Sequence, residues 1–511
     1  MTTTLTALRA QIAQDELLTG ADADLYRHDV YATGPAPVGV FRPGTVESLA
    51  RGVGAASAAG LAIVPRGGGM SYTGGYLGPD VPFLLVDTSG LNRIVALDEA
   101  TMTLTVECGA SWADIARLLR PKGLRVRSWG TLSGINATVG GGMSQNGLFW
   151  GARDGSLVDS LLSMDVVLAD GTLVATGNRL FRAYGPDLTG LFTSDGGAFG
   201  IKARATLRLV REGPGFAYGS FAFDSAQGVF GAMAAIAREG LAAECFGFDP
   251  FLQAQRMKRD SLSADAKSLV TMMKAQGSVL RALKEGAKVA LAGRSFLDNA
   301  PFSIHCIAER RRESEAQADM ADIGRIVAEH GGSPVENTIP KILRANSFPP
   351  VNSMVGPSGE RWVPVHGLIA HDRLVEGWNA IQALFANQAT AMERHGVQAG
   401  ALLATVSPQC CLIEPVFYWP DALNPLHHHA VEPSHMARFK GFAANAEASA
   451  YVASLRKALI DVFQRLDAVH LQIGRAYPLQ TRHDPAAWAA LQALKQQLDP
   501  RNLMNPGVLG L

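Results

Sequence analysis

Glycine is concentrated at four places in the chain. The clusters are Gly67–Gly69 with Gly74–Gly75, Gly140–Gly142 with Gly147 and Gly151, Gly185–Gly200, and Gly507. Each follows a segment that we predict to be a strand. Because glycine has no Cβ, its backbone N–H groups can approach a ligand closely and form anion-binding concavities. Several such loops that converge favour a diphosphate ligand; the alternative is that they only join strands. The single phosphate-loop string GxxxxGKS/T does not occur.

The segment IEPVFYWPD (413–421) carries the densest set of reactive side chains. In a strand, Glu414, Val416 and Tyr418 share one face. If this face lines an active site, a carboxylate and a phenol line it too, and the carboxylate is suited to general-base catalysis. The alternative is a structural ion pair between Glu414 and an arginine such as Arg475. Both interpretations stay open.

Histidines are further candidates for acid–base chemistry. His366 ends a predicted apolar strand and is expected to project into a site, whereas His305 and His470 fit a core position as well as a catalytic one. The triplet His427–His429 follows Asn424 and Pro425 in a predicted loop or helix start. Because consecutive residues point in different directions, we interpret the triplet as a solvated surface run, and we predict no metal site.

Composition narrows the class of protein. The 511 residues include 46 basic and 46 acidic side chains, and the absence of net charge disfavours nucleic-acid binding. The hydrophobic share of 47% and the charged share of 18% are typical of globular domains. No run of 18 apolar residues and no signal-peptide pattern occurs, so we predict no membrane span. Five cysteines without a CxxC pair argue against a disulfide framework and favour a cytoplasmic location.

The elements that must position these residues are short strands and helices. An amphipathic helix is predicted for 1–20, with Leu5, Leu8, Ile12 and Leu17 at helical spacing. Before the Pro/Gly cluster 211–215, the first predicted domain boundary, strands are expected at 61–64, 83–87, 103–109, 161–168, 172–175 and 203–210, and helices at 45–60 and 111–123. After it, strands are expected at 301–308, 362–370, 400–406 and 411–418, and helices at 226–243, 262–292, 314–330, 445–466 and from 486 to about 499. This second pattern predicts helices packed on an antiparallel sheet.

Seven segments, in this order and spacing, resemble flavoproteins of the vanillyl-alcohol oxidase / p-cresol methylhydroxylase (PCMH) superfamily. They are RHDVYATGPAPVGVFRPGTVESLA (27–50), IVPRGGGMSYTGG (63–75), VDTSGLNRIVALDEATMTLTVECGASWADI (86–115), ATVGGGMSQNG (137–147), DVVLADGTLVATG (165–177), DLTGLFTSDGGAFGIKARATLRL (187–209) and LDPRNLMNPG (498–507). The resemblance covers 25–210 and the last 45 residues well and the middle loosely. It implies an α+β fold with a bipartite PCMH-type FAD-binding domain, 1–215 plus the returning segment 466–511. Residues 216–465 then form an α+β cap (substrate) domain with an antiparallel sheet.

The resemblance also implies which residues bind FAD. The pyrophosphate loop is implied at Pro65, Arg66, Gly67, Gly68, Gly69, Met70 and Ser71, and a second wall at Gly130, Thr131, Thr138, Val139, Gly140, Gly141, Gly142, Asn146 and Gly147. Ser156 stands where these proteins place a small polar residue beside the flavin ring, and Gly200 and Ile201 resemble the segment at the adenine end. Asn505 lies in the terminal Asn-Pro-Gly turn near the isoalloxazine, and Arg475 completes the set. Met143-Ser144-Gln145 stands where covalent members carry a histidine, so non-covalent FAD is expected.

Two branches of the superfamily differ in substrate. The branch that oxidises D-2-hydroxy acids has a His-x-Gly-Asp-Gly-Asn-x-His strand and a later Glu-His-Gly that hold a metal, whereas this chain reads SPQCCLIE (407–414) and VHLQIGR (469–475). The branch that oxidises para-substituted phenols often reads Trp-x-x-Pro-Val, which RWVPVHG (361–367) resembles. Tyr72 falls near one of its phenol-binding tyrosines, but the Tyr-Arg pair expected near 470 is missing.

The sequence thus predicts an FAD-dependent oxidase or dehydrogenase that takes hydride from a small aromatic alcohol or para-substituted phenol and passes electrons to O2 or another acceptor. Predicted catalytic residues are Glu414, His470, His366 and Tyr418, and predicted substrate-binding residues are Tyr72, Arg475 and Trp419. The first alternative is a D-2-hydroxy-acid dehydrogenase of the D-lactate or glycolate type, with Arg475 or Arg361 on the carboxylate. The second is a redox-inactive flavin-binding module. The oligomeric state stays open, with a homodimer as one option.

Overall fold

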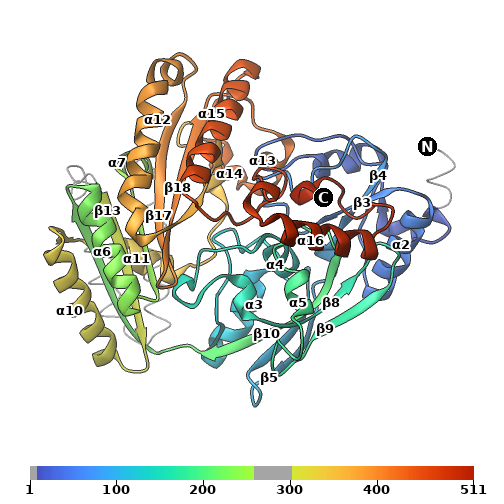
Figure 1. Cartoon of the computed structure of the whole chain (residues 1–511), viewed down its shortest axis with the longest axis horizontal. Helices are drawn as coiled ribbons and strands as arrows, with labels where there is room; N and C mark the ends of the chain where they lie inside the picture. Colours follow the sequence, from blue (N-terminus) through green and yellow to red (C-terminus); the bar gives the residue numbers. More distant parts are fainter. Residues whose placement is uncertain (1–7, 258–301) are drawn as a thin grey trace.

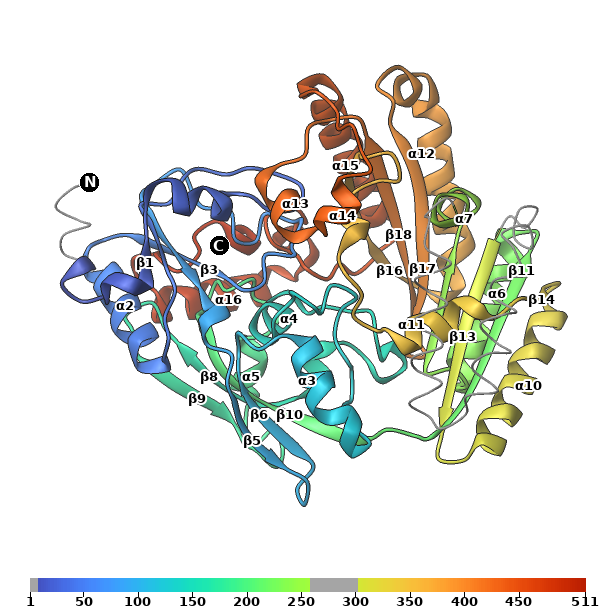
Figure 2. The same cartoon turned by 180° about the vertical axis from the view of Figure 1, so that it is seen from behind.

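Three β-sheets organise the protein, for which a computed structural model describes residues 8–257 and 302–511. The two sheets of the first part of the chain lie on one side of the molecule, and the sheet of the middle part lies on the other (Figure 1). Figure 2 shows the same arrangement from behind. We refer to the sheet of the middle part as the cap sheet.

The first sheet has four strands in the order β1-β2-β4-β3. Its elements are β1 (Leu17–Leu18), β2 (Gly39–Phe41), α2 (Val46–Ala58), β3 (Ala62–Arg66) and β4 (Phe83–Asp87). The β2·β4 and β3·β4 pairs are parallel, so α2 serves as the crossover from β2 to β3. Helix α2 confirms the helix predicted for 45–60; it begins after Thr45, whose side chain accepts a hydrogen bond from the Ser48 backbone N–H.

The second sheet is antiparallel, in the order β5-β6-β10-β8-β9, with β7 paired to the end of β10. Its strands are β5 (Ile94–Asp98), β6 (Thr103–Glu107), β7 (Leu124–Val126), β8 (Leu161–Val167), β9 (Leu173–Gly177) and β10 (Ile201–Arg211). Helices α3 (Trp112–Leu119), α4 (Val139–Gln145) and α5 (Leu188–Leu191) accompany it. The strands predicted for 161–168 and 172–175 are present as β8 and β9, which pair antiparallel across a turn at Asp170-Gly171.

The cap sheet has the order β14-β11-β13-β12-β17-β18-β15, with β16 also paired to β18. Its strands are β11 (Gly215–Phe223), β12 (Glu244–Phe248), β13 (Phe302–Arg310), β14 (Ser333–Val335), β15 (Arg361–Pro364), β16 (Gly367–Ala370), β17 (Gln398–Val406) and β18 (Cys410–Trp419). The helices of this part are α6 (Ala226–Glu239), α7 (Pro250–Met257), α10 (Glu313–Glu329), α11 (Thr338–Ala345), α12 (Leu374–Arg394), α13 (Pro425–Ala430), α14 (Pro433–Met436) and α15 (Ala446–Arg465). All pairs in the sheet are antiparallel, which confirms the predicted α+β class.

The end of the chain returns to the first part. Backbone hydrogen bonds join Ile63 of β3 to Leu503 (2.7 Å) and to Asn505 (2.8 Å). Helix α16 (Pro485–Leu498) carries the buried Lys495, whose ammonium group donates to Asp499 (2.7 Å) and to the carbonyl oxygen of Ala198 (2.8 Å). The first part of the chain and its last segment therefore pack as one body, as the dark red α16 beside the blue strands illustrates (Figure 1).

Two predicted elements differ in the structure. The amphipathic helix as far as Leu17 is wrong within the described residues, because Gln14–Glu16 is a 3-10 turn and Leu17–Leu18 pairs with β2; Leu8 and Ile12 are nevertheless buried. The single strand predicted for 362–370 is divided into β15 and β16. Pro415 of β18, opposite the break, has no N–H to donate, so the ladder is interrupted there. The helix predicted for 262–292 lies outside the described residues.

No helix in the described ranges is both long and apolar enough to span a bilayer. The predicted domain boundary at 211–215 coincides with the passage from β10, which ends at Arg211, to β11, which begins at Gly215. The three-part division into 1–215, 216–465 and 466–511 stays a prediction.

Candidate active site

A cavity lies where loops of the first two sheets meet the cap sheet. The space in it that is open to the centres of water molecules is about 250 Å³. One wall consists of glycine-rich backbone, and we call it the glycine wall. The other consists of side chains from the cap sheet and from the segments around 72, 148 and 351, and we call it the cap wall.

The glycine wall brings together three of the predicted clusters. Gly67–Gly69, Gly140–Gly142 and the pair Gly196 and Gly200 all line the cavity. The loops approach so closely that a Cβ added at Gly68 would clash with the carbonyl oxygen of Asn136. Gly69 also has φ +73°, which L-residues with a side chain rarely adopt. Glycine is therefore required here by close approach and by backbone conformation.

The loop after β3 presents hydrogen-bond donors to the cavity. None of the backbone N–H groups of Gly67, Gly68, Gly69 and Met70 donates to another residue in the ranges that the structure describes. Arg66, beside them, is buried, and its Nε has no partner in those ranges. Its guanidinium lies over the rings of Tyr26 (4.9 Å) and Tyr76 (5.3 Å). A run of free N–H groups next to a cation fits a diphosphate.

Arg475 and Asn505 hold the glycine wall together from behind, and neither lines the cavity. The Asn505 amide nitrogen donates to the carbonyl oxygens of Gly75 (2.8 Å) and Gly196 (2.7 Å). The Arg475 guanidinium donates to the carbonyl oxygen of Gly74 (2.8 Å) and to Asn505 Oδ1 (3.3 Å). Both residues therefore fix the spacing between two of the glycine loops.

The other predicted cofactor residues fall into two groups. Pro65, Met70, Ser71, Thr131, Thr138, Gly147 and Ile201 line the cavity. Val139, Gly130, Asn146 and Ser156 do not. Ser156 begins a 3-10 turn, where its hydroxyl donates to Asp159 Oδ2 (3.0 Å). Asn146 ends α4 with φ 48°, and its side-chain oxygen is buried with no partner in the described ranges.

The cap wall takes every second residue of β18. Leu412, Glu414, Val416 and Tyr418 line the cavity, as the period-two alternation predicts. Glu414 is the one carboxylate among the described lining residues, and the two cations among them, Arg66 and Lys202, belong to the glycine wall. The Lys202 ammonium group is paired with the buried Asp195 carboxylate. The cap wall is thus apolar and aromatic around a single acid.

Tyr72 reaches the cap wall from the glycine-rich loop. Its ring meets Trp362 edge-on at 5.8 Å, and its hydroxyl oxygen accepts a hydrogen bond from the Gln472 amide nitrogen (3.2 Å). Burial, and then the Glu414 charge, raise the pKa of Tyr72 well above its ordinary value, so the hydroxyl stays protonated. Gln472 was not predicted from the sequence. It lines the cavity with φ 51°, a conformation that no pattern in the sequence indicates.

His366 lies behind Glu414 rather than in the cavity lining. Its Nδ1 is 3.9 Å from Glu414 Oε2 and 3.4 Å from the hydroxyl oxygen of Tyr477. Its Nε2 contacts the backbone of Leu471, 2.9 Å from the oxygen and 3.1 Å from the nitrogen. Burial, and then His470, lower the pKa of His366 to about 3, so the ring is neutral at neutral pH. No sequence pattern indicates a role for Tyr477.

His470 also lies outside the cavity lining. Its Nδ1 donates to the backbone oxygen of His366 (2.7 Å), and its ring stacks on Tyr477 at 4.2 Å. Burial lowers the pKa of His470 to about 4. The structure therefore joins His366, His470 and Tyr477 into one buried cluster next to Glu414.

Three further residues singled out in the sequence, Trp419, Arg361 and His427, do not line the cavity. Trp419 alternates to the opposite face of β18 from Tyr418, and its indole N–H donates to Ser449 Oγ (2.9 Å). Arg361 donates to the backbone oxygens of Ala422 (3.3 Å) and Val30 (3.4 Å), and it does not line the cavity. The interpretation of the histidine triplet as solvated is wrong for His427, which is fully buried against Asn424 (2.7 Å).

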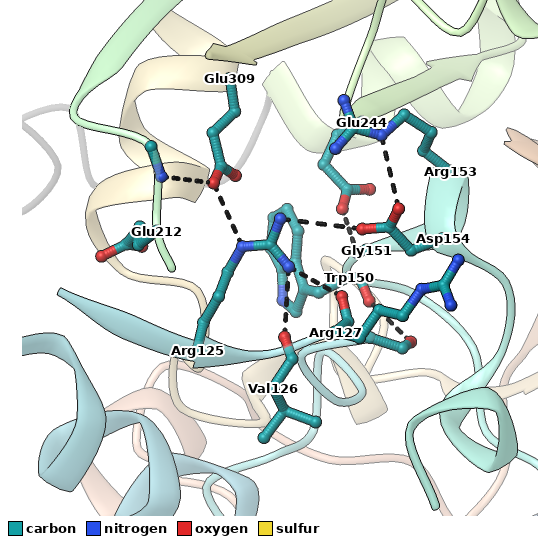
Figure 3. Close-up of polar contacts among 12 residues, drawn as sticks. Arg125, Val126, Arg127, Trp150, Gly151, Arg153, Asp154, Glu212, Glu244 and Glu309 are labelled. Carbon is teal, nitrogen blue, oxygen red and sulfur yellow. Dashed lines mark hydrogen bonds and ion pairs between the residues drawn. The ribbon is translucent and has the colours of Figure 1, made fainter. Parts of the chain in front are cut away.

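The loop that carries Leu148 and Phe149 into the cavity is attached to the cap sheet by the charged cluster of Figure 3. The backbone N–H of Gly151 donates to the buried carboxylate of Glu244 on β12. Arg125 of β7 lies 3.2 Å from Glu309 of β13 and 3.7 Å from Asp154. Burial raises the pKa of Glu244 to about 8, although the Gly151 N–H and nearby arginines oppose the rise.

Two family models match the chain. The FAD binding domain matches residues 37–177, and the C-terminal domain of FAD linked oxidases matches residues 473–509. Glycolate oxidase subunit GlcD of Bacillus subtilis is 32% identical over 176 residues, which are 34% of this chain and 37% of the relative. Xylooligosaccharide oxidase of Thermothelomyces thermophilus is 34% identical over 168 residues, 33% and 32% of the two chains. The matches thus span about a third of these relatives' length.

Solved structures show the same fold over nearly the whole chain. p-Cresol methylhydroxylase with bound substrate has a TM-score of 0.73 at 15% identity, with 100% of this chain and 96% of that chain covered. 4-Ethylphenol oxidase from Gulosibacter chungangensis has a TM-score of 0.72 at 14% identity, with 100% and 97% covered. The family models thus identify an FAD binding domain in residues 37–177 and a segment like the C-terminal domain of FAD linked oxidases in residues 473–509, with FAD as the cofactor. The solved structures show that the fold of the whole chain is that of p-cresol methylhydroxylase.

Proposed function

We propose that this FAD-linked oxidoreductase acts on a small aromatic alcohol or a para-substituted phenol, with the alcohol as the better fit. The observation that carries the proposal is the cap wall, where Glu414 is the only charged side chain among the described lining residues and apolar and aromatic side chains surround it. Such a wall fits a substrate with an uncharged aromatic ring and one hydroxyl group whose proton Glu414 can accept.

The glycine wall fits the cofactor. The free N–H groups of Gly67–Met70 and the Arg66 guanidinium would hold the diphosphate, and Arg475 with Asn505 would keep the loops at the required spacing. When bound, FAD supplies an acceptor for the hydride of the substrate carbon. The segment Met143-Ser144-Gln145 at the end of α4 contains no histidine, which supports non-covalent binding.

Glu414 and Tyr72 have complementary roles toward a hydroxyl group. The Glu414 carboxylate accepts the hydroxyl proton as the carbon is oxidised. The Tyr72 hydroxyl, whose oxygen already accepts from Gln472, keeps its proton and donates a hydrogen bond to the substrate oxygen. A phenolate fits this wall less well, because none of the cap-wall side chains that the structure describes is a cation and the Glu414 charge opposes a second negative charge.

The alternative is a D-2-hydroxy acid. Relatives named glycolate oxidase and D-lactate dehydrogenase favour it. It requires a cation on the substrate carboxylate, but neither Arg475 nor Arg361 lines the cavity, and both donate to protein oxygens. We therefore place it second. Transfer of electrons to O2 or another acceptor, a cytoplasmic location and a homodimer remain predictions.

Anaerobic flavin bleaching tests the proposal. We expect 4-methoxybenzyl alcohol and vanillyl alcohol to reduce the flavin faster than 4-ethylphenol, and D-lactate to leave it oxidised. Reduction by D-lactate alone would establish the alternative. Protein that is purified colourless and gains no visible absorbance with added FAD would support the redox-inactive module. Flavin that stays with the precipitate in acid would contradict non-covalent binding.

A further inference from the structure

We infer that the substrate carries an extended apolar substituent, and that this substituent lies along β18 from Glu414 past Val416 to Tyr418. The inference rests on the proposed function, since it places the reacting hydroxyl at Glu414. It adds the chemical class of the remainder of the substrate: an uncharged alkyl or aryl chain para to the reacting carbon.

The length of the cavity follows from the strand. Residues of an antiparallel strand advance by about 3.4 Å each, so Glu414 and Tyr418, four residues apart, are separated by about 14 Å. Val416 lies between them on the same face, and all three side chains line one cavity. The cavity therefore runs along the strand beyond the acid for the length of several carbon–carbon bonds.

Apolar side chains of neighbouring segments line the same cavity. Trp362 of β15 stands opposite Tyr418 in the strand register. Val351 and Met354 line the cavity from the segment before β15, and Leu252 lines it from α7. No charged side chain other than Glu414 belongs to the cap wall as far as the structure describes it. A charged substituent would lose its hydration here without a partner, whereas an alkyl chain would gain from leaving water.

The stretch is also preformed. Val416 and Tyr418 pair with β17 through Gly400 and Gln398, and with β15 through Pro364 and Trp362. Strand β18 is thus held by a neighbouring strand on each side. Binding of the alkyl chain therefore does not require β18 to become ordered. Burial of each additional methylene should raise kcat/KM by about three- to fourfold until the end of the stretch is reached.

The experiment compares 4-alkylbenzyl alcohols, from unsubstituted to 4-butyl, in anaerobic flavin reduction. We expect the second-order rate constant of flavin reduction to rise with the length of the alkyl chain, by about tenfold or more over two methylenes. Val416→Trp fills the stretch between Glu414 and Tyr418, so the ratio of the 4-butyl to the unsubstituted alcohol should collapse toward one. Leu412→Trp, which adds bulk on the other side of Glu414, should keep that ratio.

Three outcomes overturn the inference while the proposed function stands. These are reduction that is insensitive to chain length, a ratio that Val416→Trp leaves intact, and a ratio that only Leu412→Trp abolishes. Reduction by none of the alcohols instead contradicts the proposed function. If Val416→Trp does not fold, Val416→Ala, which widens the stretch, should shift the optimum to a longer chain. Binding of butylbenzene, which has no hydroxyl group to oxidise, should perturb the flavin spectrum of wild type and not of Val416→Trp.

Discussion

Nδ1 of His366 lies 3.9 Å from Oε2 of Glu414, at the point where the pairing of β18 passes from β15 to β16. The two side chains differ in surroundings: Glu414 lines the cavity, whereas His366 is buried behind it. Because burial keeps the imidazole neutral, its single proton can face either Glu414 or Leu471. His366 is therefore a partner for Glu414 that can either donate or accept a hydrogen bond.

Glu414→Gln should slow flavin reduction by the substrate by about a hundredfold or more, because the amide cannot accept the hydroxyl proton. FAD content should not change, since the diphosphate contacts lie on the opposite wall of the cavity. Stopped-flow reduction at saturating substrate, together with the visible spectrum of the purified protein, measures both quantities. Unchanged reduction kinetics would remove Glu414 from the mechanism.

His366 should act as a positioning residue for Glu414. When Nε2 accepts from the Leu471 N–H, the proton sits on Nδ1 and stabilises the ionised carboxylate. His366→Leu removes this donor, so the acid limb of the pH–rate profile should move to higher pH by about 0.5–1 unit. His366→Asn places an amide N–H near the Nδ1 position and should leave the limb close to that of wild type.

The two substitutions separate this role from a packing role. Loss of packing would lower the rate of both variants at every pH and would leave the limb in place. The ring itself adds no ionisation above about pH 5, because its pKa is lowered to about 3. An acid limb that is identical in His366→Leu and wild type would contradict the positioning role.

Much of the cavity follows from sequence patterns, and some of it does not. The glycine clusters and the alternation of Glu414, Val416 and Tyr418 place these residues correctly, because both rest on local backbone geometry. The same alternation puts Trp419 on the other face of β18. Its prediction as a substrate-binding residue rested on its aromatic ring and did not take the strand periodicity into account.

The contributions of Gln472 and Tyr477 depend on tertiary structure. Both lie in the segment that returns from the cap, and their partners are Tyr72 and His366, about 400 and 111 positions away in the chain. The position of such contacts is set by how the last segment packs, for which local propensity carries no information. Ser156 shows the opposite case. The family resemblance predicts it beside the flavin ring, but it does not line the cavity.

Gly68→Ala should abolish FAD binding, because the added methyl group clashes with the backbone oxygen of Asn136 and neither backbone can yield without moving the glycine wall. The variant should purify colourless. Gly324→Ala is the matched control: Gly324 lies within α10, and a Cβ there meets no atom within 4 Å. The control should keep its FAD and gain about 0.5–1 kcal/mol in stability. Full FAD content in Gly68→Ala would contradict the assignment of this loop.

Glu244→Gln should make the protein more stable at high pH. The pKa of Glu244 is raised to about 8 in the folded protein from an ordinary value near 4.5, so the folded state holds a proton that the unfolded state has lost over this range. Stability from this group is therefore lost as pH rises from 4.5 to 8. Glutamine keeps an acceptor for the Gly151 N–H and does not ionise.

The difference in Tm between Glu244→Gln and wild type should grow as pH rises, by about 2 °C or more between pH 5.5 and 8.5. Glu244→Ala is the control for the hydrogen bond, because it removes both the charge and the acceptor and leaves the Gly151 N–H without its partner. It should lose stability at every pH. A Tm difference for Glu244→Gln that does not change with pH would show that Arg125 and Arg153 keep the carboxylate ionised in the folded protein, so that Glu244 attaches the Phe149 loop to the cap sheet as a charge.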